Sequence, residues 1–273
     1  MAANERPNEC SGVTGDGSLV CLAIETSNPS LLAPAASGVA VGRIVPGMLQ
    51  RTVVLGQSPL DVLDKRRDDL ALCVQRALAS AGLALVHVRC IAVSVGPGGF
   101  TSIRSAIATG AMLAETLGEM GGCEVSCRGV PSVLSAWFGL RDLYGAGPVG
   151  VALAAKADTV FAARFGAHDF GAAGDAGVYG EATGAAIVAG ADADAWMAGI
   201  AGGVLTADEH LPELFAAAAA RAGVRVVSPM LDGASCLAAA AVCPAIGAEA
   251  VAAIYGREPE AVTIWKRRAE KVK

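Results

Sequence analysis

The sequence is poor in aromatic side chains, in charge and in histidine. Of its 273 residues, 4% are aromatic and 17% are charged, and three are histidines. A chain with so little charge is not a coiled coil, and its 34 glycines do not follow a collagen-like repeat. Its core must be built from small aliphatic residues, because hydrophobic residues make up 53% of the chain while aromatics are scarce. This length is enough for two small domains or one large one.

A net positive charge is also lacking. The chain has 21 Lys and Arg against 26 Asp and Glu, a formal charge of −5, so it has no overall attraction to nucleic acid or anionic membranes. Any contact with RNA would have to be local. The final segment is locally basic, through Lys266, Arg267, Arg268, Lys271 and Lys273. It offers a contact for tRNA, but no aromatic residues are interleaved to stack bases, so a solvated tail is the alternative.

Long uninterrupted apolar runs are missing as well. A membrane span needs about 20 apolar residues. The stretch 182–205 is broken by Asp192 and Asp194, and 233–248 contains Pro244, so we expect both to be buried elements and no part of the chain to enter a membrane. Residues 1–18 lack the apolar core of a secretion signal. We therefore predict a disordered tail over 1–18 and a cytoplasmic protein.

The sequence offers neither a metal-binding pattern nor a catalytic triad. Its eight cysteines are scattered, apart from Cys123 and Cys127 in a C-x₃-C spacing. The histidines, His87, His168 and His210, are far apart, so no second ligand pair and no Ser-His-Asp or Cys-His arrangement can be assigned. We predict no metal and no cofactor, and we expect most cysteines to be small buried residues.

The first half of the chain follows the order β-β-β-α-β-α-β. Patterning predicts strands over 19–24, 38–43, 51–55, 89–95 and 124–130, and helices over 68–81 and 102–117. A meander that leads into right-handed parallel crossovers is the topology of a ribonuclease-H-like lobe. We place this lobe at 19–130.

The second half partly repeats this order. It predicts a hairpin over 149–154 and 159–165, strands over 200–205 and 224–227, and helices over 192–198, 211–222 and 234–255. The predicted fold class is therefore α/β, an actin-like (ASKHA) fold of two ribonuclease-H-like lobes, each a mixed sheet flanked by helices. The second, smaller lobe and the C-terminal helix occupy 131–256, part of that helix completes the first lobe, and 257–273 form the C-terminal segment with the basic tail.

A glycine-rich turn between a strand and a helix is the densest motif. It consists of Gly96, Pro97, Gly98, Gly99, Phe100, Thr101 and Arg104. Unpaired amides at such a helix start bind anions, but the G-x₄-G-K-[ST] spacing of a phosphate loop is missing, so a tight structural turn is the alternative. Thr101 is the predicted N-cap. Arg104 lies in the first helical turn, where its charge opposes the helix dipole, so we expect it to bond carbonyls or a carboxylate near the turn.

This motif resembles the G-P-G-S-F-T-G-[LI]-R signature of the bacterial TsaB (YeaZ) family. Residues 22–27, Leu-Ala-Ile-Glu-Thr-Ser, are similar to the family's opening L-A-I-D-T-S strand, and 81–83 and 258–265 also resemble family segments. Departures mark a divergent member: Gly99 replaces Ser, Ser102 and Ala106 replace Gly, and Glu25 replaces the usual Asp. The triplets at 66–68 and 154–156 also differ from those of the family at these positions.

The resemblance implies a non-catalytic subunit. In that family the protein pairs with a catalytic paralogue, TsaD, and with the ATPase TsaE, to form threonylcarbamoyladenosine at position 37 of tRNAs that read codons beginning with A. It also implies a possible homodimer and tRNA contact only within the complex. The chain lacks the H-x₃-H motif that the catalytic paralogue carries. One alternative is an ATP-dependent small-molecule kinase of actin-like fold, in which residues 96–101 would hold the phosphate. Another is a peptidase, but the sequence offers no catalytic triad for it.

The end of the first strand is a candidate for a degenerate nucleotide site. It comprises Glu25, Thr26 and Ser27. In an actin-like fold an acidic residue here can reach a nucleotide-bound metal, whereas a lone carboxylate at a strand end can equally hydrogen-bond a turn.

The two N-terminal helices predict a partner interface. Apolar residues at helical spacing mark their inner faces: Ile103, Ile107, Gly110, Ala114 and Leu117 on one helix, and Leu70, Val74, Ala77 and Ala81 on the other. The opposite faces carry Leu72, Gln75, Arg76, Ala79, Ser105, Ala108 and Met112, which are more apolar than solvent-facing helices require. Two such helix pairs can close into a four-helix bundle, and the family resemblance indicates the same surface. The alternative is that the C-terminal segment covers it.

Overall fold

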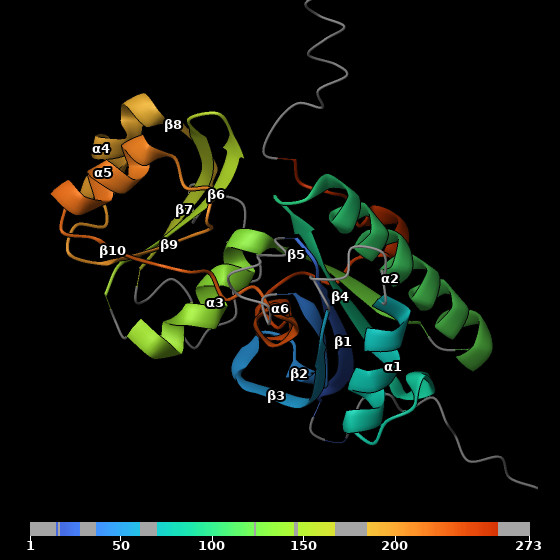
Figure 1. Cartoon of the computed structure of the whole chain (residues 1–273). Helices are drawn as coiled ribbons and strands as arrows, with labels where there is room; N and C mark the ends of the chain where they lie inside the picture. The colour runs from blue at the N-terminus through green and yellow to red at the C-terminus, as the bar shows by residue number, and fades with distance from the viewer. Residues whose placement is uncertain are drawn as a thin grey trace, which may run out of the picture.

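The computed structural model describes residues 15, 17–27, 37–60, 70–122, 124–144, 147–166 and 185–255. The predicted tail over 1–18 therefore lies outside the described residues apart from 15, 17 and 18, and the basic tail lies wholly outside them. Figure 1 shows two groups of strands, each accompanied by helices, with the N-terminal group in blue and teal.

The first sheet has five strands in the order β3-β2-β1-β4-β5. They are β1 (Leu19–Glu25), β2 (Gly38–Val45), β3 (Met48–Pro59), β4 (Cys90–Gly96) and β5 (Ser126–Pro131). β1, β2 and β3 form an antiparallel meander, and β1, β4 and β5 are parallel. β1 and β4 are buried on both faces, which explains their continuous apolar sequences. Helices α1 (Leu70–Ser80) and α2 (Phe100–Gly121) pack on one face of this sheet.

The second sheet repeats this arrangement. Its strands are β6 (Val149–Lys156), β7 (Thr159–Phe165), β8 (Ala186–Ala189), β9 (Val204–Ala207) and β10 (Arg225–Val227), in the order β10-β9-β6-β7-β8. Again three strands are antiparallel and two crossovers are parallel. Helices α4 (Ala193–Ala198) and α5 (Glu213–Arg221) cover its outer face. The predicted actin-like fold of two mixed sheets flanked by helices is confirmed.

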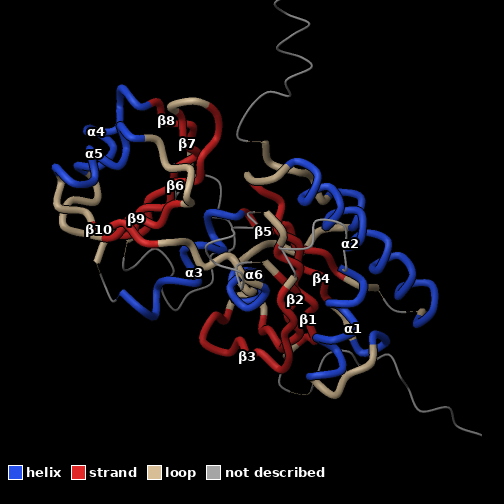
Figure 2. Tube along the Cα trace, viewed as in Figure 1, coloured by secondary structure: helices blue, strands red, loops and turns tan. Residues whose placement is uncertain are grey.

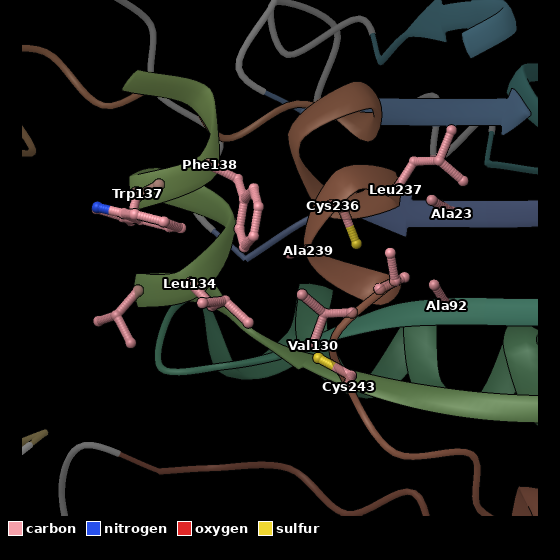
Figure 3. Packing of buried hydrophobic residues seen from close by; sticks show 14 of the residues in the cluster. Ala23, Ala92, Val130, Leu134, Trp137, Phe138, Cys236, Leu237, Ala239 and Cys243 are labelled. Atoms are coloured by element: carbon pink, nitrogen blue, oxygen red, sulfur yellow. The ribbon is translucent and has the colours of Figure 1, made fainter. Parts of the chain in front are cut away.

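Helices α3 (Ser132–Tyr144) and α6 (Gly233–Ala240) lie between the sheets, as Figure 2 shows. One apolar core includes residues of both helices and of both sheets. Trp137 of α3 stacks on Phe165 of β7 at 5.3 Å between ring centroids, while Phe138 points toward α6 (Figure 3). A single core of aliphatic, cysteine and aromatic side chains therefore joins the two halves.

The predicted helix over 234–255 is wrong. Helix α6 ends at Ala240, and Pro244 a few residues later has no amide to continue the helical ladder. Ile246 then forms an antiparallel bridge with Cys127 of β5, and a short 3-10 turn follows at Ala248–Ala250. We call residues 246–255, which run along the first sheet after this point, the C-terminal strap.

Other boundaries also differ from the prediction. The strand expected over 200–205 begins only at Val204, because residues 200–203 form a turn in which Gly202 has φ +70°. Helix α2 starts at Phe100, with Gly99 as its N-cap, so Thr101 is not the cap. It continues past Gly118 to Gly121, where Gly122 at φ +59° ends it. Helix α3 and strand β8 were not predicted, and short 3-10 turns lie at Leu85–His87 and Gly190–Asp192.

No helix of the described ranges is long and apolar enough to cross a membrane.

Candidate functional site

The structure brings the end of β1 and the glycine-rich turn together. β1 and β4 are parallel neighbours, with Ile24 registered against Val93, so their carboxyl ends meet at one edge of the sheet. The Thr26 hydroxyl donates a hydrogen bond to the Ser102 carbonyl at 3.0 Å. The amide of Gly99 donates to the Ser27 carbonyl at 2.7 Å. Two segments singled out separately in the sequence thus form one structural unit.

Glu25 is fully buried in this unit. Its Oε1 accepts hydrogen bonds from the Ser27 amide at 2.8 Å and from the Ser27 hydroxyl at 2.6 Å. Burial raises the pKa of Glu25, and the hydroxyls of Ser27, Ser135 and Ser94 offset part of that rise. Oε2 makes no hydrogen bond of normal geometry within the described residues. The carboxyl group points into the protein and holds the turn that follows its own strand.

Glycines in the turn allow close backbone contacts. Gly96 has φ +98°, and a Cβ there would overlap the carbonyl of Ile254 in the C-terminal strap. A Cβ at Gly98 would overlap the Ser27 carbonyl. The peptide between Gly96 and Pro97 is cis. Gly96 therefore leaves space for the C-terminal strap, and Gly98 leaves space for the end of β1. Close backbone packing explains both glycines, and no bound ligand is needed to explain them.

Among the described residues, the hydrogen-bond partner of Arg104 is a hydroxyl rather than the predicted carbonyl or carboxylate. Its Nε donates to the Tyr255 hydroxyl at 2.9 Å, and its guanidinium lies 3.9 Å from the Phe100 ring centroid. The rings of Phe100 and Tyr255 are 5.2 Å apart. The amide of Ile254 donates to the Val95 carbonyl at 2.6 Å and fixes the strap beside them. The sequence did not reveal Tyr255 as a partner because it suggested a helix there.

The predicted partner residues lie on helices α1 and α2, on the side away from the sheet. All are exposed or half-buried: Leu72, Gln75, Arg76, Ala79, Ser105, Ala108 and Met112. The inner-face residues of both helices are buried or half-buried. Met112 is 59% exposed, and Met120, which the sequence argument did not include, is 75% exposed. In the described part of the chain the C-terminal strap packs against the inner core of α2 and leaves Ala108 and Met112 uncovered.

Metal ligands do not gather near this site. Within the described ranges, no three side chains of His, Cys, Asp or Glu are grouped as a metal site. Cys123, half of the C-x₃-C pair, lies outside the described residues, as does the triplet at 66–68.

Solved structures share the actin-like fold of this chain. A solved structure described as an uncharacterized protein with similarity to the peptidase YeaZ from Pseudomonas aeruginosa matches 87% of this chain and 99% of its own, at 18% identity and a TM-score of 0.56. YeaZ from Pseudomonas aeruginosa matches 54% of this chain and 59% of its own, at 24% identity and a TM-score of 0.40. The ROK hexokinase from Thermus thermophilus matches 82% and 98%, at 13% identity and a TM-score of 0.38.

A family model described as TsaD, tRNA N6-adenosine threonylcarbamoyltransferase, matches residues 53–182. That range contains α1, the glycine-rich turn, α2 and the first hairpin of the second half. No curated protein matches the chain. The family match over 53–182 and the shared fold agree with the resemblance drawn from the signature turn.

Proposed function

We propose that the chain is the non-catalytic partner subunit of the complex that forms N6-threonylcarbamoyladenosine at position 37 of tRNAs reading codons that begin with A. It acts by dimerising with a TsaD-type catalytic paralogue, and a TsaE-type ATPase joins the complex. The outer face of α2, with Ala108 and Met112 exposed, carries this proposal, because an apolar helical face open to solvent is typical of a protein interface. The family match over 53–182 supports it.

The geometry of the strand ends supports a role without chemistry of its own. Glu25 is buried and accepts hydrogen bonds from Ser27, so among the described residues its carboxylate is not presented to a ligand at this end of the sheet. The three histidines form no H-x₃-H pair. The core shared by both sheets also opposes the opening and closing between lobes that substrate binding in such folds would need.

The kinase alternative requires a second phosphate turn in the second half. The glycine-rich stretch there, 199–203, precedes β9, so it lies at the amino end of that strand, whereas the turn at 96–99 follows the carboxyl end of β4. Gly199 also packs against the side chain of Arg164. The two glycine-rich segments therefore cannot face one ligand from equivalent positions.

Co-purification with the TsaD-type protein of the same genome tests the proposal. We expect a stable complex by size-exclusion chromatography, and we expect tRNA to gain threonylcarbamoyladenosine, measured by mass spectrometry, only when the partners are present. The chain alone should neither modify tRNA nor hydrolyse ATP. Ligand-stimulated ATP turnover that survives further purification and is lost in Glu25→Ala would instead establish the kinase.

A further inference from the structure

Two cysteines face each other at the centre of the first sheet. Cys21 of β1 is registered directly against Cys90 of β4 in the parallel ladder, and both are fully buried in the core beneath α6. Neighbouring strands lie about 4.8 Å apart, which falls within the range of Cα separations, about 4.4–6.8 Å, that a disulfide spans. Both side chains lie in the same core, on one face of the sheet.

A buried guanidinium lies beside this pair. Arg128 of β5 is 4% exposed and is registered against Ala92, two residues beyond Cys90 on the same strand face. It donates hydrogen bonds to the carbonyls of Ala240, at 3.1 Å, where α6 ends, and of Cys243 just beyond it. Its positive charge acts on the nearby thiol of Cys90. Among the described residues no carboxylate pairs with Arg128. Since a buried charge needs a counter-charge, the Cys90 sulfur is the group placed to provide one.

The other thiols of this core differ from Cys90. The neighbouring Cys21 thiol and the Arg128 guanidinium lower the pKa of Cys90 against the opposing effect of burial. Burial raises the pKa of Cys236, and it raises the pKa of Cys243 to about 12. Cys90 is thus the thiol in this group that is activated as a nucleophile, because the thiolate is the reactive form.

We propose that Cys90 and Cys21 form an oxidation site, in which peroxide converts the pair to a disulfide across β1 and β4. The Cys90 thiolate attacks one oxygen of hydrogen peroxide, the O–O bond breaks, and Cys90 becomes a sulfenic acid as hydroxide leaves and is protonated to water. The Cys21 sulfur then attacks the Cys90 sulfur, the S–O bond breaks, and the Cys21 proton leaves with the oxygen as a second water. Two electrons pass from the two sulfurs to the peroxide.

The disulfide removes the negative charge that faces Arg128. The guanidinium then keeps the α6 carbonyls as partners but loses its counter-charge, so oxidation weakens the contact between α6 and the first sheet. Since both sulfurs are fully buried, peroxide reaches them only when α6 opens, and the reaction is slow compared with that of an exposed thiol.

Disulfide mapping after peroxide treatment tests this site. Cys10 and Cys21 lie on the same tryptic peptide, because Arg6 precedes proline and the next cleavage point is Arg43. The experiment therefore uses the full chain carrying Cys10→Ser, treats the folded protein with hydrogen peroxide, blocks free thiols after denaturation and digests with trypsin. We expect a linked pair of peptides, 1–43 with 90–104. Cys90→Ser and Cys21→Ser should each abolish it, whereas Cys73→Ser, at a buried thiol of α1, should leave it intact.

The role of Arg128 is tested by the rate at which the linked pair appears. Arg128→Lys keeps a positive charge and should retain the reaction, while Arg128→Met should slow it about tenfold through loss of thiolate. If the methionine variant does not fold, the lysine variant and the cysteine variants still decide the question. Recovery of Cys90 as an unmodified thiol after other cysteines have been oxidised, or a link from Cys90 to a cysteine other than Cys21, would overturn the proposal.

Discussion

The two halves of the molecule share a strand order but differ in the turns and helices that follow their parallel strands. In the first half β4 leads through a glycine turn into a helix of 22 residues, α2. In the second half β9 leads through residues 208–212 into α5, which has nine residues and Pro212 as its N-cap. Burial patterns preserve the topology in both halves, whereas among the described residues the glycine turn, the buried carboxyl group and the long helix occur in the first half alone.

The outer helix surfaces differ in the same way. In the second half Arg221 of α5 pairs with Asp194 of α4 at 2.7 Å, so these helices are linked by charge on their exposed side. In the first half the exposed side of α2 carries Met112 and Met120. Thioether side chains adapt their shape to a partner, so the exposed side of α2 is suited to a protein partner.

The largest effect is expected from charge placed on that face. Ala108→Arg or Met112→Asp on α2 should abolish association with the TsaD-type partner, and any homodimer, because each buries an unpaired charge in the interface. Matched changes in the second half, Ala217→Arg and Leu214→Asp on α5, should leave association unchanged. Size-exclusion chromatography measures the complex and circular dichroism the fold. Co-elution of both α2 variants at wild-type affinity would place the interface elsewhere.

Glycine substitutions in the two halves should differ in their effect on stability. Gly98→Ala should cost about 1–3 kcal/mol of unfolding free energy, because the new Cβ overlaps the Ser27 carbonyl and the two backbones must separate. Gly147→Ala, before the first strand of the second half, meets no atom within 4 Å and should be neutral or slightly stabilising. Urea unfolding of both variants measures the difference. Equal stabilities would show that the turn tolerates a side chain.

Much of the strand and helix order is predictable from the sequence, because the hydrophobic pattern of each element indicates how it is buried. The continuous apolar stretches at 19–25 and 90–96 and the helical spacing in α1 and α2 led to the correct elements. Helix α3 was missed because it follows β5 directly, without a turn signal between Pro131 and Ser132. The end of α6 was missed because Ala-rich sequence has high helix propensity, although Pro244 follows closely and has no amide to continue the helical ladder.

The site was predictable in its parts but not in its contacts. The glycine signature identified the turn, and Glu25 was recognised by its place at a strand end. The hydroxyl groups around Glu25, from Ser94 and Ser135, lie far from it in sequence and join it only through the parallel register and the start of α3. Tyr255 is likewise distant from Arg104 in sequence, so its hydrogen bond to Arg104 could not be predicted.

A smaller, pH-dependent effect is expected at Glu25. Burial raises its pKa in the folded protein, so between the ordinary and the raised pKa the folded state holds a proton that the unfolded state has released. The stabilising contribution is complete below the ordinary pKa, and the free energy of unfolding falls as pH rises through this interval. Glu25→Gln should remove that fall, whereas Glu213→Gln, at an exposed carboxyl of α5, should retain it. Urea unfolding at several pH values measures both, and parallel curves for wild type and Glu25→Gln would contradict the assignment.

The smallest effect is expected from two exposed arginines that lie over aromatic rings, one in each half. Arg104 lies 3.9 Å from the Phe100 ring centroid and hydrogen-bonds Tyr255, whereas Arg164 lies 5.1 Å from the Trp196 centroid. An exposed cation–π contact contributes about 0.5–1 kcal/mol, so Arg104→Ala should lower the melting temperature by a few degrees and Arg164→Ala by less.

The two variants also differ in what they release. Arg104 holds the C-terminal strap through Tyr255, so its loss should speed hydrogen exchange at the Ile254 amide, which bonds the Val95 carbonyl at 2.6 Å. Tyr255→Phe keeps the ring but removes the hydroxyl, and should give an intermediate rate. Arg164→Ala should leave that amide protected as in the wild type. If Arg104→Ala changes neither the melting temperature, nor the exchange at Ile254, nor partner binding, then the strap is held by its backbone bonds alone and Arg104 has no structural role at the turn.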